Sequence, residues 1–207
     1  FQNTYQYKKK IILEKIGFQP KFSILYAGTF GRVNGIQYVI DLACMLIKYD
    51  PEIVFILVGS GSEKKEIINE AKIKKILNKN VFILDSVPKE ELPQLYYECD
   101  MGSSFVIPIE ELWANSASKF FDTLAASRPI LINYQGWQKE VINKENIGYI
   151  LPPQISDNAV KNFVQYLNNE SLLEEQRQNS LKIAEQKYSK VMAIEKYEVI
   201  LKGTQSY

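Results

Sequence analysis

Short apolar runs alternate with segments of helical periodicity over most of this chain. The apolar runs predict strands at 22–28, 53–58, 81–84, 101–106, 130–133 and 148–151. Apolar positions three and four residues apart predict helices at 36–47 and 62–77, one that ends near Glu98, and one at 116–126. From about residue 156 to the end of the chain the pattern is helical only.

Regular alternation of strands and helices predicts the architecture. The run 53–58 is apolar at every position, which is typical of a parallel strand covered on both faces. Successive βαβ units with right-handed crossovers build a doubly wound parallel α/β sheet of the Rossmann-like kind. We therefore expect one domain over 22–207, with the helical carboxy-terminal segment attached to it, and 1–21 as an incoming segment or interdomain linker.

The fold class also predicts where a ligand binds. In open parallel sheets, ligands occupy the crevice outside the carboxyl ends of the strands. Glycines follow three of the predicted strands, at Gly28, Gly59 and Gly136, and glycine lets the backbone approach a ligand closely.

Composition limits the chemistry. The chain has 207 residues, 46% hydrophobic and 24% charged, as in a globular rather than a disordered protein. It contains no histidine, which excludes Ser-His-Asp and Cys-His nucleophiles, and its two cysteines, Cys44 and Cys99, are too few for a usual zinc site. We predict both to be buried thiols of a reducing compartment. A net charge of +1 gives no broad attraction for nucleic acid, and no apolar run approaches the ~20 residues of a membrane span.

The loop after the first strand, 28–35, reads Gly-Thr-Phe-Gly-Arg-Val-Asn-Gly. Amides exposed at the start of the following helix form an anion site, and the glycines allow turns that aim them inward. The loop is neither a P-loop nor a Gly-x-Gly-x-x-Gly dinucleotide fingerprint. From its residues alone, a tight turn without a ligand remains an equal alternative.

The segment 113–129 contains a second candidate. Ser116 or Ser118 can cap the helix that follows, and Lys119 then lies in the first turn, where the helix dipole disfavours a cation. A diphosphate at the site would explain that lysine. Asp122, one turn later, could accept hydrogen bonds from sugar hydroxyls. The alternative is a Lys119–Asp122 pair on a solvated helix surface.

Four motifs in order carry a family resemblance, which covers about 22–151. They are Gly28 to Asn34-Gly35 after the first strand, 55–61 with its Gly-Ser-Gly turn, 80–92 with Asp85-Ser86-Val87, and 119–129 with Lys119, Asp122 and Arg128-Pro129. Together they resemble the carboxy-terminal domain of a GT-B glycosyltransferase of the retaining group 1, or family 4. Lys187-Tyr188-Ser189 and its helix are similar to the family's last segment, and 113–122 is most similar to a branch of N-acetylfucosamine transferases for O-antigen and capsule.

The resemblance implies a function and a set of site residues. The domain would bind a UDP-sugar, and the similar branch of the family implies that the sugar is an N-acetyl amino sugar. No metal or other cofactor would be required. Lys119 would neutralise the leaving diphosphate, and Asp122 would hold the ribose hydroxyls; these two are the predicted catalytic residues. The donor-binding residues would be Gly28, Thr29, Gly31, Arg32, Asn34, Gly35, Gly59, Asp85, Ser86, Val87, Leu92, Asn115, Ser116, Ser118, Lys119 and Asp122.

The resemblance also implies partners. The acceptor would be a glycan or a lipid-linked sugar in cell-surface polysaccharide synthesis, as for lipopolysaccharide or capsule in bacteria. The other wall of the cleft would be an amino-terminal domain of a longer chain, without which the isolated domain would be inactive. We expect a cytoplasmic protein with peripheral membrane contact, for which Lys8-Lys9-Lys10 is a candidate segment.

The chain departs from the family pattern at several positions. Thr29 and Asn34 replace an arginine and a lysine that many relatives have, and Ala114 stands where many have the first of two glutamates, with Glu110 and Glu111 nearby. Two other functions therefore stay open. One is a dinucleotide-binding oxidoreductase domain, although Ser60 replaces the acid expected after the second strand. The other is a non-catalytic Rossmann-like interaction domain.

Overall fold

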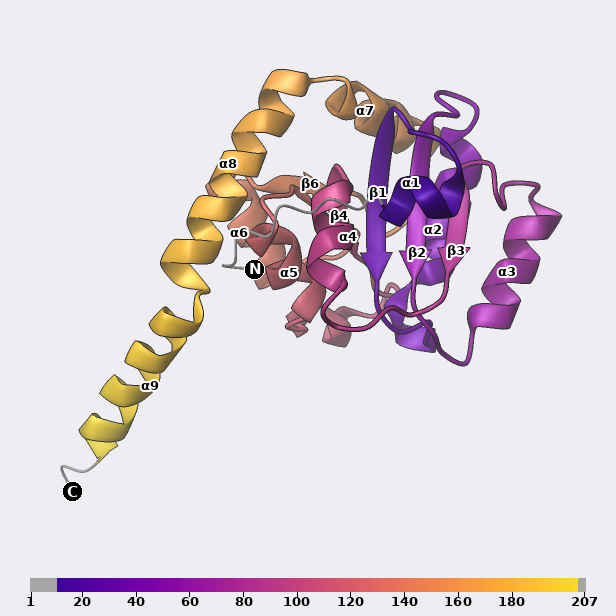
Figure 1. Ribbon diagram of the computed structural model, residues 1–207. Coiled ribbons are helices and arrows are strands. Elements are labelled where there is room, and N and C mark those ends of the chain that lie inside the picture. Colours follow the sequence, from indigo (N-terminus) through magenta and orange to yellow (C-terminus); the bar gives the residue numbers. More distant parts are fainter. Residues whose placement is uncertain (1–10, 205–207) are drawn as a thin grey trace.

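The computed structural model describes residues 11–204 and confirms the parallel α/β sheet. Six strands lie in the order β3-β2-β1-β4-β5-β6, and every pair is parallel (Figure 1). The strands are β1 (Phe22–Ala27), β2 (Ile53–Val58), β3 (Val81–Leu84), β4 (Met101–Ser104), β5 (Ile130–Ile132) and β6 (Gly148–Ile150). All six match the predicted apolar runs within two residues.

Helices cover both faces of this sheet. The side chains of β1 and β2 are buried at every position, which explains why these strands are apolar throughout. On one face, α2 (Ile36–Leu46) and α7 (Asp157–Leu167) pack against Tyr26 and Phe55. On the other face, α1 (Ile11–Ile16) and α4 (Leu92–Glu98) pack against Leu25 and Ile56. Helix α5 (Ser118–Ala125), α6 (Trp137–Glu145) and α8 (Glu170–Lys187) enclose the core beside β5.

Two helix predictions need correction. Helix α3 is Lys64–Ile73 rather than 62–77, because Lys75 and Asn78 adopt left-handed backbone conformations that turn the chain into β3. Helix α6 was not predicted at all, since its sequence is mostly polar and buries only Gln138 and Ile142. Two loops predicted as irregular contain short 3-10 helices, η1 (Arg32–Asn34) and η2 (Glu110–Ala114).

The segment after β6 is helical, as predicted. Helix α7 contacts α2, and α8 packs along α5. The last helix, α9 (Lys190–Thr204), projects away from the sheet in Figure 1 and exposes Val191, Ile194, Tyr197 and Leu201.

Three expectations from composition can also be compared with the structure. Cys99 is a buried free thiol as predicted, whereas Cys44 is only partly buried. Lys8-Lys9-Lys10, with the rest of 1–10, lies outside the described residues. Among helices in the described part of the chain, none combines the length and hydropathy needed to cross a bilayer.

Candidate functional site

The carboxyl edge of the sheet, where the strand arrows end at the bottom of Figure 1, brings the predicted loops together. The Gly28 amide donates to the Val58 carbonyl at 2.9 Å, and the Phe30 amide donates to the Ser60 carbonyl at 2.8 Å. A Cβ on Gly59 would lie 1.8 Å from the Gly28 carbonyl oxygen, so only glycine permits this approach. The loops after β1 and β2 therefore form one continuous surface.

The loop after β1 is stabilised from within. The carbonyl oxygen of Thr29 accepts hydrogen bonds from the Tyr26 hydroxyl at 2.7 Å and from Asn34 Nδ2 at 2.9 Å. Gly35 has φ of 59°, and a Cβ there would lie 2.8 Å from the Val106 backbone. Asn34 thus shapes the loop with its side chain, while Thr29 and Arg32 are exposed at its rim.

Lys119 reaches this loop from the first turn of α5. Its Nζ lies 5.0 Å from the centroid of the Tyr26 ring, and a Cβ built on Gly28 would lie 3.1 Å from it. Gly28 and Lys119, far apart in the sequence, are therefore neighbours at the edge of the sheet. An ammonium group in this position faces the same space as the amides of the loop.

Lys119 and Asp122 are a partly buried pair of charges rather than a surface ion pair. Burial lowers the pKa of Lys119, an effect that the nearby Asp122 carboxylate partly offsets. Burial also raises the pKa of Asp122, against the opposing charges of Lys89 and Lys119. The described part of the chain shows no ion pair between the two side chains. The alternative of a solvated helix surface does not fit, because both groups carry a desolvation penalty that an anionic or hydroxylated ligand could relieve.

The segment that leads into α5 corrects the predicted cap. The N-cap residue is Ala117 and makes no side-chain bond, so neither Ser116 nor Ser118 caps the helix, and both are exposed. Asn115 organises the turn instead: its Oδ1 accepts from the Ala117 amide at 3.2 Å and its Nδ2 donates to the Leu112 carbonyl at 2.8 Å. Its side chain is thus engaged within the loop.

The turn after β3 lies at the other end of the candidate site. Asp85 and Ser86 are exposed, whereas Val87 and Leu92 pack against the core beside α1 and α4. Lys64 Nζ donates to Asp85 Oδ1 at 2.8 Å, and this hydrogen bond lowers the pKa of the Asp85 carboxyl group. Sequence reasoning did not identify Lys64, although a lysine in the first turn of a helix was the signal that identified Lys119.

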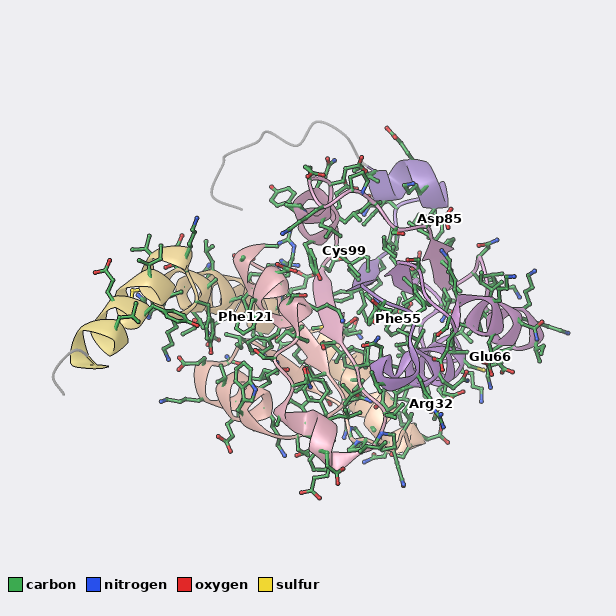
Figure 2. The ribbon with its side chains drawn as sticks, turned by 90° about the horizontal axis from the view of Figure 1, so that it is seen from below. Arg32, Phe55, Glu66, Asp85, Cys99 and Phe121 are labelled. Atoms are coloured by element: carbon green, nitrogen blue, oxygen red, sulfur yellow. The ribbon has the colours of Figure 1, made fainter. Side chains whose placement is uncertain are left out.

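The strand order sets the spacing of these groups. Lys119 follows β4 on one side of β1, and Asp85 follows β3 on the other, with β2 between β1 and β3. Figure 2 looks onto this edge and shows Arg32 and Asp85 apart, with the label of Phe55, a residue of β2, at a height between theirs. Since strands lie about 4.8 Å apart, the candidate site extends across four strands and suits an elongated ligand with one anionic part.

Comparisons with known proteins identify a family. Residues 8–183 match the family described as "Glycosyl transferases group 1". Spore coat protein SA of Bacillus subtilis is 22% identical over 155 residues, which are 72% of this chain and 40% of that protein.

Solved structures share the fold. Anabaena HepE in complex with UDP superposes with a TM-score of 0.78 at 17% identity, over 93% of this chain and 52% of HepE. The pneumococcal O-GlcNAc transferase GtfA, solved with UDP and GlcNAc, gives 0.72 at 16% identity, over 93% of this chain and 38% of GtfA. The separately solved carboxy-terminal domain of LpcC from Francisella tularensis superposes with a TM-score of 0.69 at 18% identity, over 86% of this chain and 91% of the LpcC domain.

The chain spans about two fifths of the spore coat protein and half of HepE, and it matches nearly the whole isolated domain of LpcC. The family match covers most of the present chain, and the sheet is parallel throughout, as the family resemblance implies. The chain therefore belongs to the group 1 glycosyltransferases.

Proposed function

We propose that this domain binds the UDP-sugar donor of a retaining GT-B glycosyltransferase at the carboxyl edge of its sheet. The observation that carries the proposal is the position of Lys119 Nζ, beside Gly28 of the first loop and one helical turn from Asp122. A cation beside a glycine-rich loop that leads into a helix suits a diphosphate, and a neighbouring carboxylate suits ribose hydroxyls.

Charge stabilisation is the chemical contribution of this site. As the sugar is transferred, negative charge grows on the departing diphosphate, and Lys119 together with the amides of 28–35 stabilises it. The lowered pKa of Lys119 reports that the amine lacks full solvation in the free domain. An anion at the site therefore gains more from this amine than from an exposed one. The proposal assigns the role to protein groups alone and includes no metal.

The relatives support the finer assignment of the substrate. HepE and GtfA were solved with UDP, GtfA also with GlcNAc, and TarM with UDP and alpha-GlcNAc-glycerol. WaaG is described as involved in lipopolysaccharide biosynthesis. We propose a UDP-linked N-acetyl amino sugar as donor, and a glycan or lipid-linked acceptor in cell-surface polysaccharide synthesis at the cytoplasmic side of a membrane.

A second domain completes the proposed enzyme. HepE, GtfA and TarM are each two to three times as long as the part that matches this chain. We propose that an amino-terminal domain supplies the acceptor site, so that this domain alone binds UDP but transfers no sugar.

Calorimetry with UDP tests the proposal. Lys119→Met should weaken binding about 30-fold and Asp122→Asn about tenfold, as expected for hydrogen bonds to charged groups. Lys79→Met is a matched control, because Lys79 is exposed at the opposite edge of the sheet. The affinity of this variant for UDP should equal that of the unmodified domain. Equal affinity in all variants would refute the site. Stabilisation by NAD instead of UDP would favour the oxidoreductase function, and no response to either would favour an interaction domain.

A further inference from the structure

Lysines gather where α3 ends and the chain turns into the edge strand β3. The segment 72–79 contains Lys72, Lys74, Lys75 and Lys79 and no acidic residue. Lys74 is paired, since its Nζ lies 3.3 Å from Asp41 Oδ1. Helix α3 forms the right-hand margin of the molecule in Figure 1, on the side away from α8 and α9. A chain with a net charge of only +1 therefore carries a local concentration of positive charge on one flank.

The other three lysines of this segment face solvent. Lys72, Lys75 and Lys79 are exposed, and none of them forms an ion pair or a side-chain hydrogen bond with the residues that the structure describes. The Lys75 amide donates to the Lys72 carbonyl at 2.9 Å, and the Lys79 amide donates to the Ile76 carbonyl at 3.1 Å. These turns fold the three lysines into one compact segment.

The backbone at Lys75 has a conformation that disfavours a lysine. Its φ is 56°, in the left-handed region. The Lys75 amide bonds to the Lys72 carbonyl and the Ile76 amide to the Ala71 carbonyl at 3.0 Å, which is the Schellman motif that ends a helix and usually has glycine at this position. The helix dipole favours cations in the last turn, but it explains neither a lysine with this backbone nor Lys79 beyond the helix end.

An apolar side chain protrudes among these charges. Ile73 is 64% exposed, whereas Ile67 and Ala71 on the inner side of α3 are buried. At the boundary of an anionic bilayer, ammonium groups meet the lipid headgroups and an apolar side chain enters the acyl region. A nucleic acid backbone would use the lysines alone. The exposed isoleucine therefore favours a membrane over a nucleic acid.

We propose that Lys72, Ile73, Lys75 and Lys79 form a docking surface for an anionic membrane, here called the lysine surface. This inference goes beyond the proposed function and does not depend on it. The lysine surface lies at the amino end of β3, whereas Lys119 lies at the carboxyl edge of the sheet. Docking there leaves the donor site open.

Sedimentation with lipid vesicles tests the lysine surface. The unmodified chain should bind vesicles of phosphatidylglycerol and phosphatidylcholine, and it should not bind vesicles of phosphatidylcholine alone. Each lysine near an anionic surface strengthens binding about fivefold, so Lys72→Gln, Lys75→Gln and Lys79→Gln together should weaken it about 100-fold. All three side chains are exposed, so this variant should unfold at the same temperature as the unmodified chain.

A matched control removes three positive charges elsewhere. Lys161→Gln, Lys182→Gln and Lys190→Gln change exposed lysines of α7, α8 and α9. The net charge of this control equals that of the lysine-surface variant, and its affinity for anionic vesicles should stay within about twofold of the unmodified chain. A loss as large as that of the lysine-surface variant would overturn the proposal, because total charge rather than position would then govern binding.

Two single substitutions separate charge, apolar contact and strain. Ile73→Ser should weaken binding to anionic vesicles about fivefold and leave binding to a single-stranded DNA oligonucleotide unchanged. Lys75→Gly should raise the melting temperature by about 3 °C, because it relieves the left-handed backbone, and yet weaken vesicle binding about fivefold. Unchanged vesicle binding by both variants would overturn the lysine surface.

The remaining outcomes distinguish the partners and the two proposals. Failure of the unmodified chain to bind anionic vesicles would overturn the docking surface. Binding of DNA at lower protein concentrations than vesicles, with no effect of Ile73→Ser on either, would overturn it in favour of a nucleic acid. UDP affinity should be the same in the lysine-surface variant and the unmodified chain, so the failure of one proposal leaves the other standing.

Discussion

Two lysines at opposite edges of the sheet, Lys21 and Lys119, are held in different ways. At the amino edge, the half-exposed Lys21 bonds to Asp50 at 2.7 Å and to Asn168 at 3.1 Å, and the bond to Asp50 raises the pKa of Lys21. At the carboxyl edge, burial lowers the pKa of Lys119. The charge of Lys21 is paired with a carboxylate of the protein, whereas burial disfavours the charge of Lys119.

Asp100 and Arg177 extend the same pattern along the amino edge. Asp100 accepts from the amide and hydroxyl of Ser23, both at 2.8 Å, and lies 3.7 Å from Arg177. These residues and Lys21 border a cavity of about 430 Å³ that also contains Asp50, Glu170 and Glu174. Two basic and four acidic side chains line it. We therefore expect substitutions at this edge to change stability, whereas those at the carboxyl edge, where the proposed donor site lies, should change binding.

The largest expected effect is on stability at the amino edge. Asp100→Ala should lower the free energy of unfolding by about 3 kcal/mol, because it leaves the buried Ser23 amide and hydroxyl without their acceptor and removes one of the two carboxylates beside Arg177. UDP affinity should not change. Urea denaturation and calorimetry measure the two quantities. Asp41→Ala, which removes an exposed pairing with Lys74, is the control and should cost below about 0.5 kcal/mol. A parallel loss of UDP affinity in Asp100→Ala would contradict the separation of the edges.

Sequence alone predicted the strands better than the ends of the site. Most of the strand segments are continuous apolar runs, which are typical of a buried parallel sheet, although β4 is Met-Gly-Ser-Ser. The proximity of Lys119 to Gly28 was also predictable, because both lie at carboxyl ends of adjacent strands. The roles of Asn34, Asn115 and Lys64 were not predictable, because each depends on hydrogen bonds to carbonyl groups whose direction is set by the folded loop. Helix α6 was missed for a related reason, since it is held by tertiary packing rather than by an apolar stripe.

Gly59→Ala tests whether the carboxyl edge has structural requirements of its own. The added Cβ would lie 1.8 Å from the Gly28 carbonyl oxygen and 3.0 Å from the Phe30 ring, so the two loops must separate. We expect a loss of about 2 kcal/mol of stability, as for other overpacked sites. UDP affinity should fall as well, because the Gly28 loop moves. Ser60→Ala is the control, since Ser60 is exposed and adjacent. A loss of stability without a loss of affinity would show that the diphosphate does not bind this loop.

Lys119→Met should raise stability while it weakens UDP binding. Removing a partly buried charge relieves its desolvation cost, and the loss of the contact with the Tyr26 ring offsets part of this gain. We expect the free energy of unfolding to rise by about 1 kcal/mol at neutral pH. The pKa of Lys119 is lower in the folded than in the unfolded chain, so the folded state loses its proton first as the pH rises toward the ordinary 10.5. The unmodified domain then regains stability, and the advantage of the variant should shrink. Thermal unfolding of both proteins across this range measures the difference. A variant less stable than the unmodified domain would contradict the unfavourable burial.

Lys21→Met should have the smallest effect and the opposite sign. Lys21 is half exposed, and exposed ion pairs stabilise by only about 0.5 kcal/mol, so the variant should be slightly less stable at neutral pH. The pKa of Lys21 is raised in the folded chain, so its contribution is complete below 10.5 and is lost as the pH rises through the folded pKa. As the pH rises, Lys21→Met should therefore become less destabilised relative to the unmodified domain. Lys119→Met, in contrast, should become less stabilised relative to it. If both variants were more stable than the unmodified domain, or both less stable, the two lysines would not differ in how the protein holds their charge.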